Sequence, residues 1–311
     1  MGDRTRYRGA LLGALVGDGL GAPFEGHAGP VPSAEVAAVA QGSSTLRFTD
    51  DTAMTVALAG SLLRMDGIDE DDLARAFADQ WALAPRRGYS STTARLLATV
   101  HDGVPWRDAL RGLESGRASN GAAMRVAPAA LHAAGRADDT LEVARRSAGV
   151  THTHPGAVAG ARVQALAVAL ALGHPTGRGI DRAEFVARLR APAGDPPLAA
   201  NLALAAGLAA RGDPAEIAAR IGTGILAAES VPAAVCAFLS HPASFPDAVI
   251  LAVRLGGDTD TIAAMTGALS GALLGESAIP AGWIERAESA APVRHLADEL
   301  FFQTQRRARL R

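Results

Sequence analysis

LGGDTDTIAAMTGALSGALLG, residues 255–275, joins an acidic turn to a helical pattern. Residues one or two apart do not share a helix face, so Asp258 and Asp260 can converge on one point only where the backbone is not yet regular helix. The two glycines before them allow the backbone such a turn. After the turn, apolar side chains recur at three- and four-residue steps, the spacing of one helix face: Ile262, Met265, Leu269 and Leu273.

The same spacing continues through much of the chain. Hydrophobic residues make up 49% of the 311 residues but aromatic residues only 4%, and alanine is abundant, which favours helices with close backbone approach. Alternation of the kind found in β-strands is nearly absent. We expect an all-α fold of ten or more helices in a single compact domain over residues 1–311, with one of the loops at 26–47. Further stripes are Met54, Leu58, Leu62 and Met65; Leu73, Phe77 and Trp81; Val163, Leu166 and Leu170; and the leucines of 198–208.

Charge and hydropathy argue against several classes of protein. The formal net charge is −2, whereas duplex-binding domains are usually basic, so nucleic acid is not expected as a direct partner. Arg162 and Gln164 interrupt the longest apolar run, so no membrane-spanning helix is expected. Arginines precede an apolar run near the N-terminus, as in a signal peptide, but Asp18 closes that run and no small-residue cleavage site follows.

The chain has one cysteine, Cys236, which cannot form an internal disulfide. Its neighbours Val235, Ala237 and Phe238 are apolar. We therefore expect a buried thiol rather than a nucleophile, and a reducing, cytoplasmic location.

A second acidic cluster, FTDDT at 48–52, also stands directly before a helical stripe. Either cluster alone could serve as a helix N-cap, because aspartate and threonine are favoured there. There are two such clusters, and each has two carboxylates and two threonines. A helix N-cap uses only one such side chain, so capping does not account for all of them. Four neighbouring carboxylates would repel each other unless a cation neutralised them. Hard oxygen ligands suit Mg²⁺, Mn²⁺ or Ca²⁺, so we expect a divalent-cation site joining the two helix starts.

Three further segments are candidates. GDGLGAPFE at 17–25 offers Asp18, interpreted as a helix-ending cap or buried hydrogen-bond acceptor, and Glu25, either a solvated loop residue or a mobile ligand or base. Small residues at 115–125 leave backbone N–H groups free to cradle phosphate, with a helix expected from about Ala122. THTHP at 151–155 holds two histidines without an evident third metal ligand, so packing or substrate contact is expected.

Together these segments resemble the ADP-ribosylglycohydrolase family, which includes the dinitrogenase reductase-activating glycohydrolase and the vertebrate ADP-ribosylhydrolases. The combination of FTDDT with GGDTDTIA is the most specific part of the resemblance. The matching pieces follow the family's order and span most of the chain: GDGLGAPFE, FTDDT, SNGAAMRVAP, THTHP, GILAAESVPAA and LGGDTDTIAAMTGALSGALLG.

The resemblance implies an all-helical fold with a binuclear magnesium or manganese centre in a cleft. Glu25 matches the glutamate of a mobile flap over the metals, and it or Asp51 would accept a proton from the attacking water. The implied metal ligands are Thr49, Asp50, Asp51, Asp258, Asp260, Thr261 and Glu25. The implied substrate-binding residues are the diphosphate loop Ser115, Gly116, Arg117, Ala118, Ser119, Asn120 and Gly121, with His152, and Ile225 beside the adenine.

The implied reaction is metal-dependent hydrolysis of the N- or O-glycosidic bond between ADP-ribose and an acceptor, releasing ADP-ribose. The implied partner is an ADP-ribosylated protein or small-molecule conjugate, with nucleic acid a partner only as a modified substrate. Some relatives have an aromatic residue where Ala118 stands, and Tyr89 could take a local aromatic role instead. Relatives that act on arginine-linked ADP-ribose can have an extra acid near 85–93, which this chain lacks.

Other functions remain open at this point. One is a different metal-dependent hydrolase that cleaves a phosphoester in an ADP-ribose-containing nucleotide. Another is a member that binds ADP-ribose without catalysis, although a broken ligand set would be expected there and all the proposed ligands are present. A metal-free glycosidase with paired carboxylates is the third, but four aspartates fit it less naturally.

Overall fold

In the computed structural model, helices α1 (Arg4–Gly21) and α15 (Thr259–Leu274) lie antiparallel in the middle of the fold. From Gly9 onwards, every fourth residue of α1 is a glycine that faces α15, and a Cβ on any of the four would lie within 2.4 Å of an α15 carbonyl oxygen. The two backbones are therefore in direct contact, and this contact fixes the C-terminal end of α1 beside the N-terminal end of α15. The four glycines are Gly9, Gly13, Gly17 and Gly21.

The structure describes residues 3–111, 118–134 and 136–310. These residues form seventeen α-helices and two short 3₁₀ helices, and no β-sheet occurs among them. The all-α prediction is confirmed. Besides α1 and α15, the elements are η1 Ala22–Phe24, α2 Ser33–Gln41, α3 Asp50–Met65, α4 Glu70–Leu83, α5 Ser91–His101, α6 Trp106–Arg111, α7 Ala127–His132, α8 Ala137–Gly149, α9 Pro155–Gly173, α10 Arg182–Arg190, α11 Pro196–Ala209, α12 Pro214–Ile221, α13 Ala227–Ser240, α14 Phe245–Arg254, η2 Glu276–Ala278, α16 Ala281–Arg286 and α17 Ala290–Arg309.

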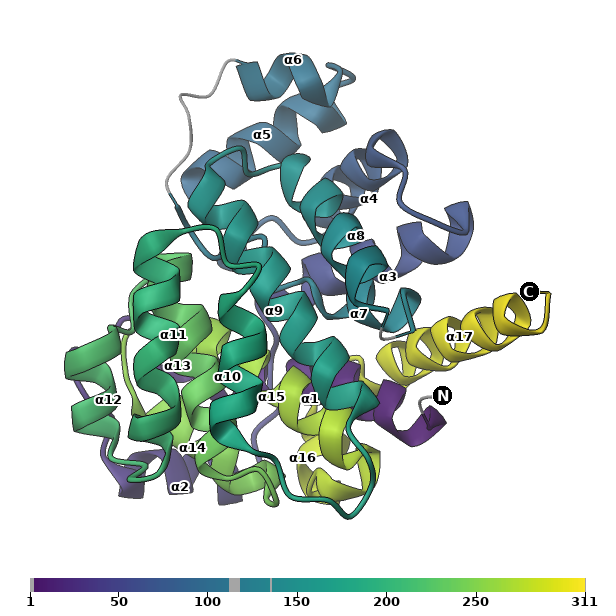
Figure 1. Cartoon of the computed structure of the whole chain (residues 1–311). Helices are drawn as coiled ribbons and strands as arrows, with labels where there is room; N and C mark the ends of the chain where they lie inside the picture. The colour runs from purple at the N-terminus through teal and green to yellow at the C-terminus, as the bar shows by residue number, and fades with distance from the viewer. Residues whose placement is uncertain (1–2, 112–117, 135, 311) are drawn as a thin grey trace.

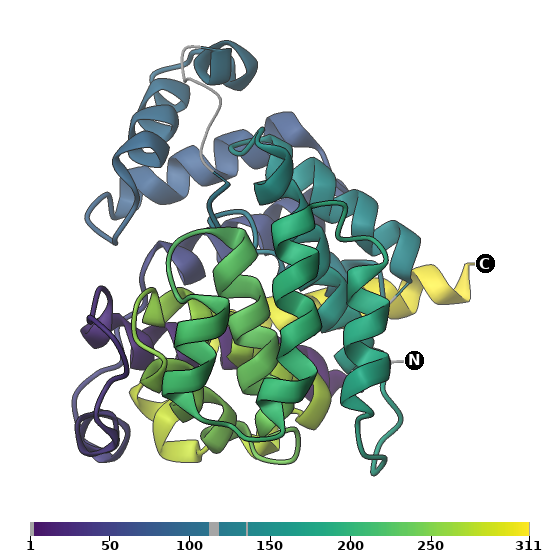
Figure 2. The ribbon, with the colours of Figure 1, turned by 60° about the vertical axis from the view of Figure 1, so that its left-hand side comes forward.

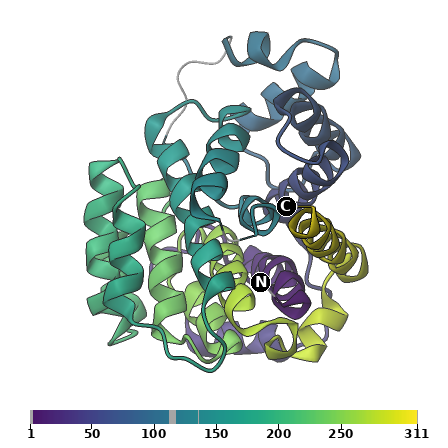
Figure 3. The same cartoon turned by 45° about the vertical axis from the view of Figure 1, so that its right-hand side comes forward.

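Helices pack around the central pair in two groups. The larger core joins α1 and α15 to α9–α14 and to α17, whose ribbon projects beside the N-terminus in Figures 1 and 3. A smaller core is built by α3, α4, α7 and α8 with one face of α9. Figures 1 and 2 show α5 and α6 at one end of the molecule, where Leu97 of α5 joins this smaller core. The starts of α3 and α15 thus come from different groups.

Helix α9 contains the apolar run that Arg162 and Gln164 interrupt. By length and composition it could cross a membrane, even though it contains Arg162 and Gln164. However, 78% of its most apolar window is buried inside the protein. Gln164 is itself buried and donates a hydrogen bond to the carbonyl of Met265 in α15, 3.2 Å away. Because of this burial and this contact, we interpret α9 as a helix of the protein core.

The predicted loop at 26–47 is wrong in part, because α2 lies within it. Glycines and prolines flank this segment and mark turns, but its interior is a short alanine-rich helix that begins after Pro32. Val36 and Ala40, one turn apart, are its buried side chains. The turn residues around a short amphipathic segment hid the helix.

Candidate active site

The two acidic clusters meet where α3 and α15 begin. The Thr261 hydroxyl donates to Oδ2 of Asp51 at 3.3 Å, across 210 positions of sequence. Glu25, at the end of η1, offers a carboxylate oxygen within 4.8 Å of one from Asp258 and one from Asp260. The predicted convergence of distant acidic turns is therefore present in the structure.

Asp18 caps α3 from the neighbouring helix α1. Its carboxylate accepts hydrogen bonds from the backbone N–H of Thr49 at 2.9 Å and of Thr52 at 3.1 Å, and from the Thr52 hydroxyl at 2.5 Å. Burial raises the pKa of Asp18 to about 7, although these donors oppose the shift. The interpretation of Asp18 as a buried acceptor is confirmed, and Asp50 is left free of this capping.

The start of α15 is shaped by Gly256 and Gly257, which have φ angles of 75° and 73° in the left-handed region. Asp258 occupies the N-cap position, yet its side chain caps no backbone N–H. Its carboxylate instead accepts a hydrogen bond from Nδ2 of Asn120 at 2.5 Å. Simple N-capping therefore does not explain this aspartate.

Two carboxylate oxygens in the cluster, Oδ1 of Asp51 and Oδ1 of Asp260, are buried without a hydrogen-bond partner among the described residues. Burial, and then the neighbouring negative charges, raises the pKa of Asp51 well above its ordinary value. The same two causes raise the pKa of Asp50 to about 8 and that of Asp258 to about 7. Such crowded, unpartnered oxygens fit a hard divalent cation, which would neutralise their repulsion.

A cavity of about 140 Å³ opens over the cluster. Of the other predicted residues, Thr49 accepts a hydrogen bond from the N–H of Asp51 as the N-cap of α3, and the carbonyl of Ala118 accepts one from Ala227 at 2.8 Å. Ser115, Gly116 and Arg117 lie outside the described residues. The predicted residues that line the cavity are Glu25, Asp50, Asp51, Ser119, Asn120, Gly121, His152, Ile225, Asp258, Asp260 and Thr261.

Comparison with known proteins agrees with this geometry. The family model described as ADP-ribosylglycohydrolase matches residues 1–309. The chain belongs to the ADP-ribosylglycohydrolase family. ADP-ribosylhydrolase ARH3 of Mus musculus is 34% identical, over 95% of this chain and 91% of its own, and that of Homo sapiens is 33% identical over 95% and 93%. A solved structure titled "ADP-ribosylglycohydrolase-related protein complex" matches with a TM-score of 0.74 and 28% identity, over 96% of this chain and 98% of that one.

Membership of the ADP-ribosylglycohydrolase family establishes the class of chemistry, hydrolysis of a glycosyl bond. A bacterial relative, the uncharacterized protein YegU of Escherichia coli, is 34% identical over 88% of this chain and 89% of its own. The resemblance drawn from the sequence motifs is confirmed over the whole chain.

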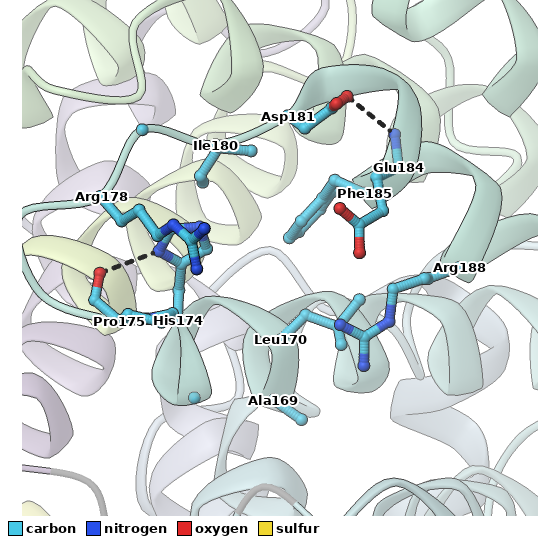
Figure 4. A pocket seen from close by; sticks show the side chains of 12 residues that line it. Ala169, Leu170, His174, Pro175, Arg178, Ile180, Asp181, Glu184, Phe185 and Arg188 are labelled. Atoms are coloured by element: carbon cyan, nitrogen blue, oxygen red, sulfur yellow. Dashed lines mark hydrogen bonds between the residues drawn. The ribbon is translucent and has the colours of Figure 1, made fainter.

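A larger cavity lies elsewhere in the protein. It measures about 620 Å³ and is enclosed by the end of α9, the loop after it and α10 (Figure 4). Asp181 is occupied there as the N-cap of α10, accepting from the N–H of Glu184 at 3.0 Å, and Arg178 and Arg188 are exposed. Cavity size therefore does not mark the site, whereas the convergence of buried carboxylates does.

Arg125 is a cavity residue that none of the sequence motifs indicates. It lines the cavity and is fully buried, with its guanidinium 4.2 Å from the centre of the Phe77 ring. The signal was a single arginine in the apolar stretch AAMRVAPAA, residues 122–130. The helix expected from about Ala122 begins only at Ala127, because residues 121–125 form turns and Pro128 stands at the helix start.

Proposed function

We propose that this chain hydrolyses the N- or O-glycosidic bond between the distal ribose of ADP-ribose and an acceptor, using two Mg²⁺ or Mn²⁺ ions. The observation that carries the metal part is the pair of buried oxygens on Asp51 and Asp260 that have no hydrogen-bond partner in the described part of the chain. The kinship with ADP-ribosylhydrolase ARH3 supports the ADP-ribosyl part. The proposed substrate is an ADP-ribosylated protein or small conjugate, with nucleic acid only as a modified substrate.

The proposed metal ligands come from both helix starts and from η1: Thr49, Asp50, Asp51, Asp258, Asp260, Thr261 and Glu25. When bound, such ions supply Lewis-acid polarisation of a water molecule and of the ribose hydroxyls. The amide of Asn120 donates to the carboxylate of Asp258, so Asn120 would orient a metal-binding residue as well as contact the substrate.

Glu25 is our candidate for the general base. Its side chain is exposed while its carboxylate lies beside those of Asp258 and Asp260. Asp51, the alternative, is buried and accepts hydrogen bonds from two threonine hydroxyls. In the proposed step, the water oxygen bonds to the anomeric carbon, Glu25 takes the water proton, and the bond to the acceptor breaks. The proton that Glu25 has accepted balances the one that the departing acceptor atom takes up, so that Glu25 returns to its ionised form.

Ser119, Gly121, His152 and Ile225 line the same cavity and are our candidates for holding the ADP part of the substrate. Ile225 is 51% exposed, so the face of the adenine ring would cover an apolar surface that water now contacts. A cytoplasmic location fits the free, buried thiol of Cys236.

Product analysis tests the reaction. Arginine-, serine- and nucleic-acid-linked ADP-ribose would be supplied in turn with Mg²⁺ or Mn²⁺. Free ADP-ribose from any of them is the expected product. AMP with ribose phosphate would identify a phosphoester hydrolase instead, and tight binding of ADP-ribose without turnover under full metal loading would identify a binding protein.

The ligand assignment has its own test. Asp258→Asn and Asp260→Asn each remove a charge but keep volume, so we expect at least about 100-fold lower activity at limiting metal with the helices intact. Asp102→Asn, which alters an exposed aspartate after α5, is the matched control. Normal turnover by both site variants at limiting metal would refute the assignment.

A further inference from the structure

The guanidinium of Arg125 is a buried charge with an unusual set of partners. Its contacts among the described residues include no carboxylate. It donates to the carbonyl of Ser147 at the end of α8, to the Thr151 hydroxyl and to the sulfur of Met54. A buried unpaired cation is costly, and here burial lowers the pKa of Arg125 to about 9. Such an arrangement calls for a role beyond packing.

A chain of short contacts leads from this cation to the cavity. Nη2 of Arg125 lies 2.7 Å from Oγ1 of Thr151, which lies 2.7 Å from Nδ1 of His152. Nε2 of His152 lies 3.1 Å from Oγ of Ser119. All of the contacts are within hydrogen-bonding distance.

The chemistry of arginine sets the direction of this chain. A guanidinium can only donate, so the Thr151 oxygen accepts from Arg125 and its own proton is free to be donated. The acceptor within reach of that proton is Nδ1 of His152. A neutral imidazole that accepts at Nδ1 carries its proton on Nε2 and donates it to Ser119. The Ser119 hydroxyl is then left to donate into the cavity.

The position of the imidazole ring is restricted as well. A Cβ on Gly121 would lie 2.9 Å from Cε1 and 3.0 Å from Nε2 of His152, so the ring lies flush against a residue without a side chain. Burial, and then the charge of Arg125, lowers the pKa of His152 to about 3, which keeps the ring neutral near pH 7. The ring is thus held in place, neutral and hydrogen-bonded at both nitrogens.

We propose that Arg125 and Thr151 are positioning residues that lock His152 in its Nε2–H tautomer, so that the Ser119 hydroxyl points its proton at an anionic oxygen of the ligand. For the ligand of the proposed function, on which this last step rests, that oxygen belongs to the diphosphate. In the opposite tautomer, the Nδ1–H of His152 would donate to a Thr151 oxygen that already accepts from the positively charged Arg125. The proton of the Thr151 hydroxyl would then have no acceptor among the described residues. Both effects disfavour it.

Nitrogen NMR of the ligand-free, ¹⁵N-histidine-labelled protein at pH 7.5 tests the lock. The His152 signal is assigned by its loss in His152→Asn. We expect the Nε2–H tautomer in the wild type and in Thr151→Ser, which keeps the hydroxyl. Thr151→Val keeps the volume but removes the hydroxyl, so its His152 should show a mixture of tautomers. An Nδ1–H wild-type ring, or a Thr151→Val spectrum with an unchanged tautomer, would overturn the proposal.

Calorimetry with ADP-ribose tests the consequence for the ligand. Thr151→Val should bind ADP-ribose about tenfold more weakly than Thr151→Ser, the cost of a weakened hydrogen bond to a charged group. Equal affinities of the two variants would refute the role of Ser119 as an oriented donor. No binding of ADP-ribose by the wild type would count against the proposed function but leave the NMR result on the tautomer intact. Circular dichroism confirms that each variant is folded.

Discussion

Gly13 of α1 and Gly267 of α15 exclude each other's side chains. A Cβ on Gly13 would lie 2.2 Å from the Gly267 carbonyl oxygen, and a Cβ on Gly267 would lie 2.0 Å from the Gly13 carbonyl oxygen. Real Cβ atoms do not approach this closely, so the reciprocal contact sets the spacing of the two helices. Since α1 carries Asp18 and α15 carries Asp258 and Asp260, the same spacing sets the site.

Gly13→Ala should therefore destabilise the protein by about 3 kcal/mol or more, because the obstacle is backbone that cannot rotate away. Gly207→Ala in α11 is the matched control, since a Cβ there meets nothing within 4 Å. That change should stabilise by about 0.5–1 kcal/mol through helix propensity. Urea unfolding of both variants measures the difference. Similar free energies of unfolding for the two would contradict the packing argument.

The sequence was sufficient to predict the fold class and the meeting of the two acidic turns. Helical spacing after Thr52 and Thr261 is a local signal, and two like-charged clusters suggest a shared counter-ion. The backbone contact of α1 with α15 was anticipated only as a general consequence of alanine content. Its actual basis, a glycine at every fourth residue of α1 from Gly9 onwards, was present in the sequence as a four-residue repeat.

Other features depend on contacts that no local pattern contains. The sequence predicts Asn120 in a diphosphate loop but gives no sign that its amide also donates to Asp258. Arg87, also missed, accepts the N–H of Asp50 at its carbonyl, 2.6 Å away, while its guanidinium pairs with Glu288. Both contacts join segments that are brought together only by the tertiary fold, so spacing along the chain could not reveal them.

Cys236 should be unreactive in the folded protein. It is fully buried, its Sγ contacts the carbonyl of Ala205 at 3.5 Å, and burial raises its thiol pKa to about 12. Little thiolate therefore exists near pH 8, and reagents cannot reach it. We expect no labelling by a thiol-reactive disulfide in native buffer and one equivalent in guanidinium. Fast native labelling would show that α13 opens far more readily than its burial suggests.

Asp298 should contribute to stability at neutral pH and lose that contribution in acid. It ties α17 to α1 by hydrogen bonds with Arg4 at 2.6 Å and Arg8 at 2.7 Å, and these hold its pKa well below the ordinary value. A lowered folded-state pKa means that the stabilisation is complete above the unfolded-state pKa of about 3.9 and declines as the pH falls below it.

Asp298→Asn should accordingly lower the melting temperature by about 2–4 °C at pH 7, because the pairs are partly exposed. The gap between variant and wild type should narrow at pH 3.5. Thermal melts at the two pH values measure it. A difference in melting temperature that grows on acidification would mean that the pKa of Asp298 is raised in the folded protein, not lowered.

Metal ions should stabilise the protein more strongly as the pH rises from 5.5 to 7.5. Burial and mutual repulsion raise the pKa of Asp50 to about 8 and of Asp258 to about 7. Groups with raised folded-state pKa values stabilise the metal-free fold only while protonated, and this contribution is lost as the pH rises from about 4 through those values. Because dications compete with these protons, their affinity rises over the same range.

The measurement is the rise in melting temperature on adding Mn²⁺ or Mg²⁺ to chelator-treated protein. At a hundredfold excess over the dissociation constant, the gain should be about 2.7 kcal/mol. Asp260→Asn separates a metal-binding role from a structural role, because it removes one of the crowded carboxylates while keeping the volume of the side chain. The variant should be at least as stable as the wild type without metal, yet gain much less when metal is added. If it were less stable without metal and gained as much with it, Asp260 would be a structural residue and the carboxylate cluster would not be the metal site.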